Sequence, residues 1–236
     1  MKSQTLRRLG QLLAAALISI ALLVMVFQFA VRPWYLNWGA TPAEISGVLP
    51  GDRLVPEAQT VTTRALTVNA PPEKIWPWLI QVGFKRAGWY NFDKLNQLLG
   101  AADYVDGHRS AWRIVPEFQR IKVGDYIRIH PVSGFYVAGL EPNRYLALWS
   151  GTDLATNKPL ALGEALPARY MQNTLTVVPV PEGAQTTHLI VRERVQASEK
   201  LGGSWSVLEP GVALQETAFR RRLKVRAERG EGGGGK

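Results

Sequence analysis

An uncharged apolar segment near the amino terminus constrains this chain more than any other feature of its sequence. Residues 9–31 carry no charged side chain. As a helix they extend for ~35 Å, which exceeds the ~30 Å hydrocarbon core of a bilayer. Three basic residues lie within residues 2–8, whereas Arg32 is the single cation directly after the segment. This pattern predicts a single-pass protein of the cell membrane with a cytoplasmic amino terminus and an extracytoplasmic main domain.

The same segment has two alternative interpretations. It resembles a secretory signal peptide, but such peptides have an apolar region of ~7–15 residues that ends at a small-residue cleavage site. Residues 27–31 (FQFAV) offer no good site of that kind. The second alternative is a buried helix of a soluble protein. We expect the uncleaved anchor.

The formal charge of +9 at first suggests a nucleic-acid-binding protein, but its distribution excludes that class. Residues 2–8 contribute +3, residues 220–236 contribute +5, and residues 9–219 contribute only +1. The body therefore has no net basic character, and we predict no nucleic-acid partner. The cations at the carboxyl end suit the end of a helix, where positive charge is favourable, or alternatively contact with anionic lipid.

The composition along the chain predicts one domain behind the anchor. The expected parts are a basic flank (1–8), a transmembrane helix (9–31), a juxtamembrane connector (32–59), an α+β domain (60–229) and a flexible tail (230–236). The connector is rich in Pro and Gly, with one short helical turn expected near residues 42–45.

Apolar spacing predicts the elements of the domain. A strand at 62–68 precedes helices at 73–82 and 91–99, the second with Phe92, Leu95, Leu98 and Leu99 on one buried face. Further strands are expected at 126–130, 135–140, 145–149, 174–180 and 188–195, with a loop over 151–170. A helix at 208–229 ends the domain, with Leu214, Phe219, Leu223 and Val225 as core contacts. An antiparallel sheet wrapped around this long helix would bury the whole set in one core.

The ordered motifs resemble a known superfamily. They are APPEKIWPWLIQ (70–81), RAGWYNFD (86–93), PEFQ (116–119), VGD (123–125), LEPNRYLAL (140–148), VRER (191–194) and RLKVRAE (222–228). Together they resemble the START-like helix-grip (SRPBCC) superfamily, and within it the polyketide cyclase/dehydrase-like bacterial proteins with an N-terminal membrane anchor. The resemblance implies a deep apolar cavity between the sheet and the terminal helix, which binds a lipid or another hydrophobic small molecule and in some members supports cyclisation or dehydration.

Seven residues are candidates for contact with such a ligand: Arg86, Trp89, Tyr90, Asp93, Glu117, Gln119 and Arg192. Arg86 or Tyr90 would bind a ligand oxygen, unless Asp93 only caps its helix or pairs with Arg86. Glu117 and Gln119 would supply acid or hydrogen-bonding groups, unless they only satisfy the backbone. Arg192 and Arg194 share one strand face, which either lines the cavity and anchors an anionic group or faces solvent.

Other chemistries lack a signal. The chain has no cysteine, and its three histidines (108, 130 and 188) lie far apart, so we predict no metal and no cofactor. Hydrolase, dinucleotide and P-loop motifs do not occur. No catalytic residue and no oligomeric state is assigned. Three functions remain: a membrane-anchored module that binds a hydrophobic small molecule or lipid, a cyclase or dehydratase, and a non-catalytic structural module.

Overall fold

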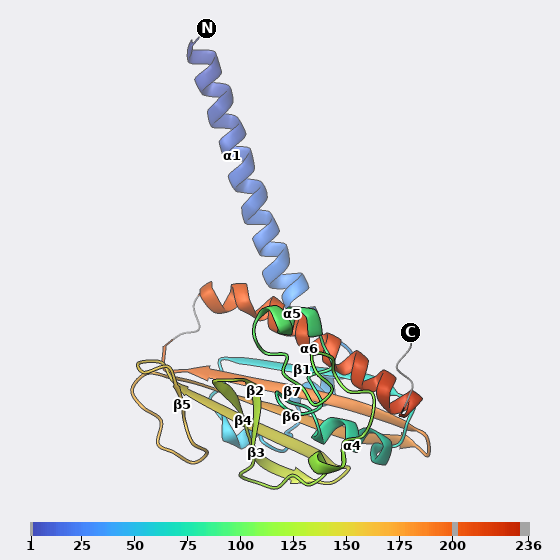
Figure 1. The fold of residues 1–236 in the computed structure, drawn as a ribbon. Coiled ribbons are helices and arrows are strands. Elements are labelled where there is room, and N and C mark those ends of the chain that lie inside the picture. The colour runs from blue at the N-terminus through green and yellow to red at the C-terminus, as the bar shows by residue number, and fades with distance from the viewer. Residues whose placement is uncertain (1, 200–202, 232–236) are drawn as a thin grey trace.

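A long helix rises from an α+β body in the computed structural model, which describes residues 2–199 and 203–231 (Figure 1). The helix consists of α1 (Lys2–Val26), a π-helical stretch η1 (Phe27–Val31) and α2 (Arg32–Leu36). From Gly10 to Leu36 it is long and apolar enough to cross a membrane, and its most apolar part is not buried against the body. The last five residues of the expected tail lie outside the described residues.

The body is built on an antiparallel sheet in which the first and last long strands are neighbours. Its strands are β1 (Thr60–Val68), β2 (Tyr126–His130), β3 (Ser133–Glu141), β4 (Tyr145–Asp153), β5 (Lys158–Pro159), β6 (Tyr170–Gly183) and β7 (Thr186–Ala197). The order is β1-β7-β6-β4-β3-β2, and β5 pairs with β4. Each predicted strand is present, and β3, β4, β6 and β7 are longer than their apolar runs because hairpin partners extend the ladder.

Three further helices belong to the body. They are α4 (Pro72–Ile80), α5 (Asp93–Leu98) and α6 (Gly203–Arg229). Two of them, α5 and α6, lie on the side of the sheet from which α1 rises (Figure 1). Figure 1 shows α6 running along this face, which we call the inner face, and α6 also packs on α4 and β1. The α+β fold with a long carboxyl-terminal helix on an antiparallel sheet therefore agrees with the prediction.

The inner-face core follows from the apolar spacing of α4 and α6. Ile75, Trp78 and Leu79 of α4 and Leu223 of α6 are buried in one cluster with inner-face side chains of the strands. Helix α4 ends at Ile80, earlier than predicted, because the chain turns at Gly83 (φ +136°) to pair with Gly88. At that φ an L side chain would be strained.

The opposite face of the sheet is covered by the connector. This outer face carries α3 (Pro42–Ser46) and the short 3-10 helix η2 (Asp52–Leu54), and a second apolar cluster forms there around Val55, Trp149 and Leu160. A further 3-10 helix, η3 (Pro116–Phe118), precedes β2. The connector is thus part of the folded body rather than a spacer.

Helix α5 buries the face opposite to the one that the sequence predicted. Leu95, Leu98 and Leu99 are exposed, whereas Asn96 is buried. The Asn96 amide donates to Asn91 Oδ1 (2.6 Å) and to the Tyr104 hydroxyl (3.0 Å). These hydrogen bonds fix the rotation of the helix, because a buried amide without partners is costly. The expectation of a buried leucine face was wrong, and it also failed for Leu214 on α6, which is 60 % exposed.

Candidate functional site

The side of α6 that faces the sheet changes character along its length. Glu209, Ala213, Glu216, Arg220, Leu223 and Ala227 recur at helical spacing and turn toward the body. The carboxyl-terminal half of this stripe is apolar and packs in the core. The amino-terminal half is charged, although it also faces the sheet, and this exception marks the candidate site.

Four charged side chains from three elements meet beneath α6. Arg64 comes from β1, Glu193 from β7, and Glu216 and Arg220 from α6; we call them the charge cluster. Arg64 and Arg220 are 2 % and 1 % exposed, whereas Glu193 keeps partial access to solvent. Buried arginines are rare unless paired, so the cluster needs an explanation beyond packing.

One ion pair joins the two layers. Arg64 Nη1 binds Glu216 Oε2, and Arg64 Nε donates to the carbonyl oxygen of Tyr35 (2.8 Å). Arg220 Nε lies 3.5 Å from Glu216 Oε1, and Arg220 Nη2 donates to Thr217 Oγ1 (3.2 Å). Breaking such a buried pair leaves an uncompensated charge and costs about 3–5 kcal/mol.

Several polar atoms of this region are buried and have no hydrogen-bond partner. Arg220 Nη1 and the hydroxyl of Thr62, which is directly across from Glu193 in the β1–β7 ladder, have no polar partner among the described residues. Arg220 Nε and Glu216 Oε1 form no hydrogen bond and have only each other, as an ion pair at 3.5 Å. An unsatisfied buried polar atom costs about 1–3 kcal/mol. Arg220 Nη1 and the Thr62 hydroxyl are therefore the two groups here that a polar group of a ligand would complete.

Burial sets the protonation of the carboxylates. The pKa of Glu193 is raised to about 7, first by burial and then by the Glu216 charge, while Arg64 acts in the opposite direction. Burial also raises the pKa of Glu216, against the effect of Arg64 and Arg220. The pKa of Arg220 is lowered by burial to about 10. Glu193 thus exchanges a proton near neutral pH, as a general acid or base requires.

The apolar part of the site adjoins the charge cluster. Leu175 is directly across from Glu193 in the β6–β7 ladder, and Leu66 follows Arg64 on the same face of β1. Both leucines are only partly buried, as are Trp89 and Leu140, which pack against the same core. The inner face therefore has partly buried apolar side chains next to hydrogen-bonding groups.

The predicted residues of the 86–93 segment hold loops together. Arg86 donates to the carbonyl oxygens of Ile80 (2.7 Å) and Val82 (3.0 Å). Asp93 accepts from Ser110 N (2.9 Å) and Oγ (2.6 Å), so it does not pair with Arg86. Asp93 thus makes neither the helix cap nor the Arg86 pair that the sequence offered as alternatives, and both side chains bind loop residues instead.

Tyr90 and Trp89 lie beneath α6. The Tyr90 hydroxyl accepts from Gln81 (2.7 Å), and its ring stacks on Phe219 with 6.4 Å between the ring centroids. Trp89 packs edge-on against Phe219, and its buried Nε1 has no hydrogen-bond partner. Trp89 is thus the predicted residue whose free donor suits a ligand.

The other three predicted residues, Glu117, Gln119 and Arg192, are either exposed or bound to other parts of the chain. Glu117 is exposed on η3. Gln119 donates to Gln81 Oε1 (3.2 Å) and to the carbonyl oxygen of Pro77 (3.3 Å). Arg192 lies on the outer face and is nearly fully buried beneath the connector, so it neither lines the inner face nor faces solvent.

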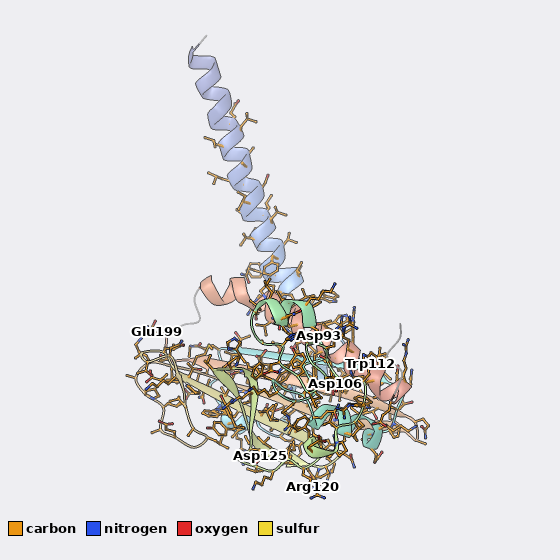
Figure 2. The ribbon with its side chains drawn as sticks, in the orientation of Figure 1. Asp93, Asp106, Trp112, Arg120, Asp125 and Glu199 are labelled. Carbon is orange, nitrogen blue, oxygen red and sulfur yellow. The ribbon has the colours of Figure 1, made fainter. Side chains whose placement is uncertain are left out.

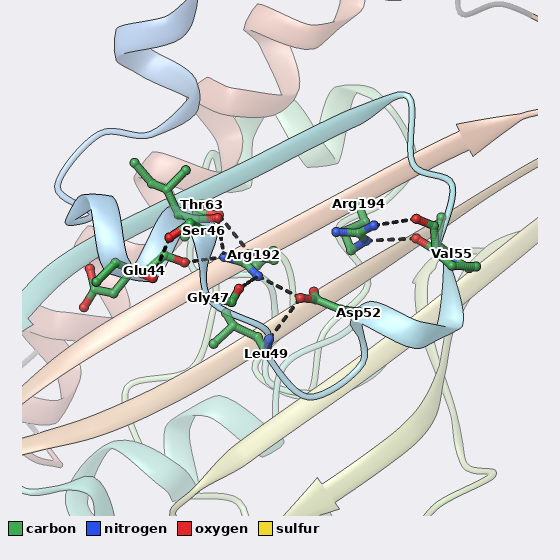
Figure 3. A network of polar contacts seen from close by, with 12 residues as sticks. Glu44, Ser46, Gly47, Leu49, Asp52, Val55, Thr63, Arg192 and Arg194 are labelled. Atoms are coloured by element: carbon green, nitrogen blue, oxygen red, sulfur yellow. Dashed lines mark hydrogen bonds and ion pairs between the residues drawn. The ribbon is translucent and has the colours of Figure 1, made fainter.

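Arg192 is the centre of the contacts that hold the connector (Figure 3). It donates to the carbonyl oxygens of Gly47 (2.7 Å), Glu44 and Ile45 (3.1 Å), and it pairs with Asp52 (2.8 Å). Arg194 donates to the carbonyl oxygen of Val55 (2.9 Å). The shared face of the two arginines was predicted, but its role is to fix chain segments.

A groove of about 520 Å³ also lies on the outer face. It runs between residues 48–54 of the connector and the strands β3 and β4, with Tyr145 and Ala147 in its wall. The groove is on the far side of the sheet from the charge cluster. Among the described residues, no group of three His, Asp or Glu side chains is placed to hold a metal ion.

Sequence reasoning missed the charge cluster, although a signal for it existed. Period-two alternation puts Arg64 on the same strand face as Leu66 and Val68. Helical spacing puts Glu216 and Arg220 on the same stripe as Leu223. Charged residues on an otherwise core-facing stripe are the signature that was available.

This chain is only weakly similar to proteins of known structure. No family model and no curated protein matches the sequence. Similar solved structures include protein MLL2253 from Mesorhizobium loti, at 17 % identity and a TM-score of 0.41, over 73 % of this chain and 99 % of that one. Another is the ZhuI aromatase/cyclase from Streptomyces sp. R1128, at 16 % identity and a TM-score of 0.34, over 72 % and 94 %. A third is CalU16 from Micromonospora echinospora, at 13 % identity and a TM-score of 0.30, over 71 % and 83 %. Likeness of this degree assigns no activity.

Proposed function

We propose that this protein is a membrane-anchored module that binds a hydrophobic small molecule or lipid between the sheet and α6, with the polar group of the ligand at the charge cluster. The observation that carries the proposal is the presence of two buried polar atoms without a polar partner, Arg220 Nη1 and the Thr62 hydroxyl. They adjoin partly buried apolar side chains such as Leu66 and Leu175.

The chemistry of the free atoms defines the ligand. Arg220 offers one donor nitrogen without a polar partner, Nη1, which suits an acceptor such as a carboxylate or carbonyl oxygen. The carboxyl of Glu193, with a pKa of about 7, can accept or donate a hydrogen bond at neutral pH. A fatty acid or an oxygenated polyketide-like molecule has both the apolar body and the acceptor group.

The anchor supports a lipid environment for this site. The helix over Gly10–Leu36 has the length and composition of a membrane span. The excess of cations before it favours a cytoplasmic amino terminus and an extracytoplasmic body. This orientation is tested with reporters fused to the carboxyl end. A reporter that works only outside the cytoplasm is expected to be active. Activity of a reporter that works only in the cytoplasm would overturn the orientation.

Binding is tested on the full-length protein in detergent micelles. Native mass spectrometry is expected to detect a co-purifying apolar molecule, and a dansyl-labelled fatty acid is expected to bind. Arg220→Met removes the donors with little change of shape and should weaken fatty-acid binding at least tenfold. Arg229→Met, an exposed site on the last turn of the same helix, is the matched control.

A second variant keeps the test independent of folding. Thr62→Val replaces an unpaired buried hydroxyl by a methyl group of the same shape. If the hydroxyl serves only packing, the change stabilises the protein and leaves binding intact. If it contacts the ligand, the change stabilises the empty protein and weakens binding. Equal binding by wild type and both variants would contradict the proposal.

A second candidate function is acid–base catalysis of the dehydratase or cyclase kind. The pKa of Glu193 near neutrality is the observation that favours it, because general acids and bases work best with a pKa near the working pH. Mass spectra of the captured molecules would then show a substrate and a product that differ by one water. Glu193→Gln should retain only the substrate, and the same product in both proteins would exclude this role.

A further inference from the structure

The outward leucines of α5 are accompanied by exposed apolar side chains on α2 and α6. Trp34 of α2 is 64 % exposed, Leu98 and Leu99 at the end of α5 are 83 % and 57 % exposed, and Leu214 of α6 is 60 % exposed. We call these four residues the docking face. Single exposed apolar residues are ordinary, but a group on adjoining elements marks an interaction surface.

Hydrogen bonds and an ion pair join the three elements that carry this face. Arg32 of α2 pairs with Glu209 of α6 (2.8 Å). Asn91, just before α5, accepts through its carbonyl oxygen from Arg222 of α6 and reaches Gln215 of α6 with its side chain (3.5 Å). The surfaces of α2, α5 and α6 are therefore parts of one side of the body.

That side is the one from which α1 rises. Figure 1 shows α5 and α6 between the sheet and the foot of α1. Figure 2 places Asp93, the first residue of α5, near the foot of α1, and Arg120 and Asp125 at the opposite end of the body. On α6, Leu214 lies on the helix face opposite to the sheet-facing Glu216.

Exposed cations flank the docking face. Lys94 on α5 and Arg221 and Arg222 on α6 are exposed, with Arg221 one heptad after Leu214 on the same helix face. The acids of this part of α6, Glu209 and Glu216, are turned beneath the helix and paired with Arg32 and Arg64. Cations around an apolar surface complement anionic phospholipid headgroups.

We propose that the docking face rests in the interface of an anionic phospholipid bilayer, the same bilayer that α1 crosses. The proposal rests on the membrane anchor of the proposed function, because the continuous helix from α1 to α2 brings the lipid surface to the foot of the body. The hydrogen bonds of Asn96 hold the leucines outward, so the apolar face is built into the fold. Docking sets α6 and the charge cluster beneath it against the headgroups.

The cysteine-free sequence makes a direct test simple. A single cysteine at Leu99→Cys, labelled with the fluorophore NBD, is compared with Val123→Cys in full-length protein reconstituted into phosphatidylcholine vesicles with a quarter phosphatidylglycerol. The two positions are matched, since Leu99 is 57 % and Val123 is 56 % exposed. Val123 is a turn residue two positions before Asp125, which Figure 2 places at the end of the body away from α1.

The expected result is a blue-shifted emission at position 99 and quenching by spin-labelled lipid at least threefold greater than at position 123. Equal quenching at the two positions would overturn the docking proposal, and so would a blue shift at position 99 without lipid quenching, which indicates burial against protein. Extraction with alkaline carbonate tests the anchor separately. A protein that resists extraction while its position 99 stays in water retains the anchor and loses the docking face.

Discussion

Arg32 and Glu209, which are 177 residues apart in the sequence, form a bidentate ion pair (Nε–Oε2 2.8 Å, Nη2–Oε1 3.0 Å). Arg32 is the first residue of α2, and Glu209 lies on the side of α6 that faces the sheet. The Tyr35 hydroxyl donates to the same carboxylate (3.2 Å). The position of α6 over the charge cluster is therefore coupled to the segment that leaves the membrane helix.

Removal of this link should loosen one half of α6. Glu209→Ala leaves Arg32 and Tyr35 without their acceptor, and we expect local opening of residues 209–216 to become easier by about 1–3 kcal/mol. Hydrogen exchange by mass spectrometry measures it. Residues 223–229, of which Leu223 and Ala227 pack in the apolar core, are the internal control, and equal loss of protection in both halves would contradict the coupling.

Glu193 should make stability depend on pH. Its folded-state pKa of about 7 lies above its ordinary value of 4.5, so between these pH values the folded protein holds a proton that the unfolded chain has lost. Stability due to this group therefore falls as the pH rises through the window. Glu193→Gln should remove about 1–3 kcal/mol of this fall. Urea unfolding at pH 4.5 and pH 8 checks it, with the exposed Glu117→Gln as control; identical pH slopes in wild type and E193Q would refute the assignment.

Arg192 should matter more for the connector than its neighbour Arg194. Arg192→Met leaves three carbonyl oxygens and Asp52 without their donor, at a cost of about 3–5 kcal/mol. Arg194→Met loses two bonds to carbonyl oxygens and should cost about 1–2 kcal/mol. Trypsin cleavage after Arg53 in the connector reports the difference, and equal cleavage rates in the two variants would argue against Arg192 as the centre of the network.

Gly39 should tolerate no side chain. It has φ +82°, and a Cβ there would collide with the carbonyl oxygen of Ala65 on β1. Gly39→Ala is therefore expected to lower the melting temperature by more than 5 °C, which corresponds to at least ~2 kcal/mol in a body of this size. Gly100→Ala is the control, because Gly100 also has a positive φ (+71°) but open space around it. Equal shifts in the two variants would mean that backbone strain alone, and not the contact with β1, sets the cost.

The sequence alone determined those features that depend on local pattern. The uncharged run at 9–31 predicts the long apolar helix, and alternation and helical spacing predict the strands, α4 and the long final helix. The α+β arrangement follows because these amphipathic elements must bury their apolar faces against one another. The resemblance to helix-grip proteins pointed to the same arrangement.

The tertiary structure decided which polar residues are buried together. Arg192 is two residues from Arg194 and shares its face, but only the path of the connector shows that this face is covered. Asn96 is buried and Leu98 exposed because Asn91 and Tyr104 supply partners for the amide, a choice that helical periodicity cannot predict. Arg64, Glu193 and Glu216 are separated by long stretches of sequence and meet only through strand pairing and the placement of α6. Local pattern sets which face each side chain takes, and long-range packing sets what lies opposite it.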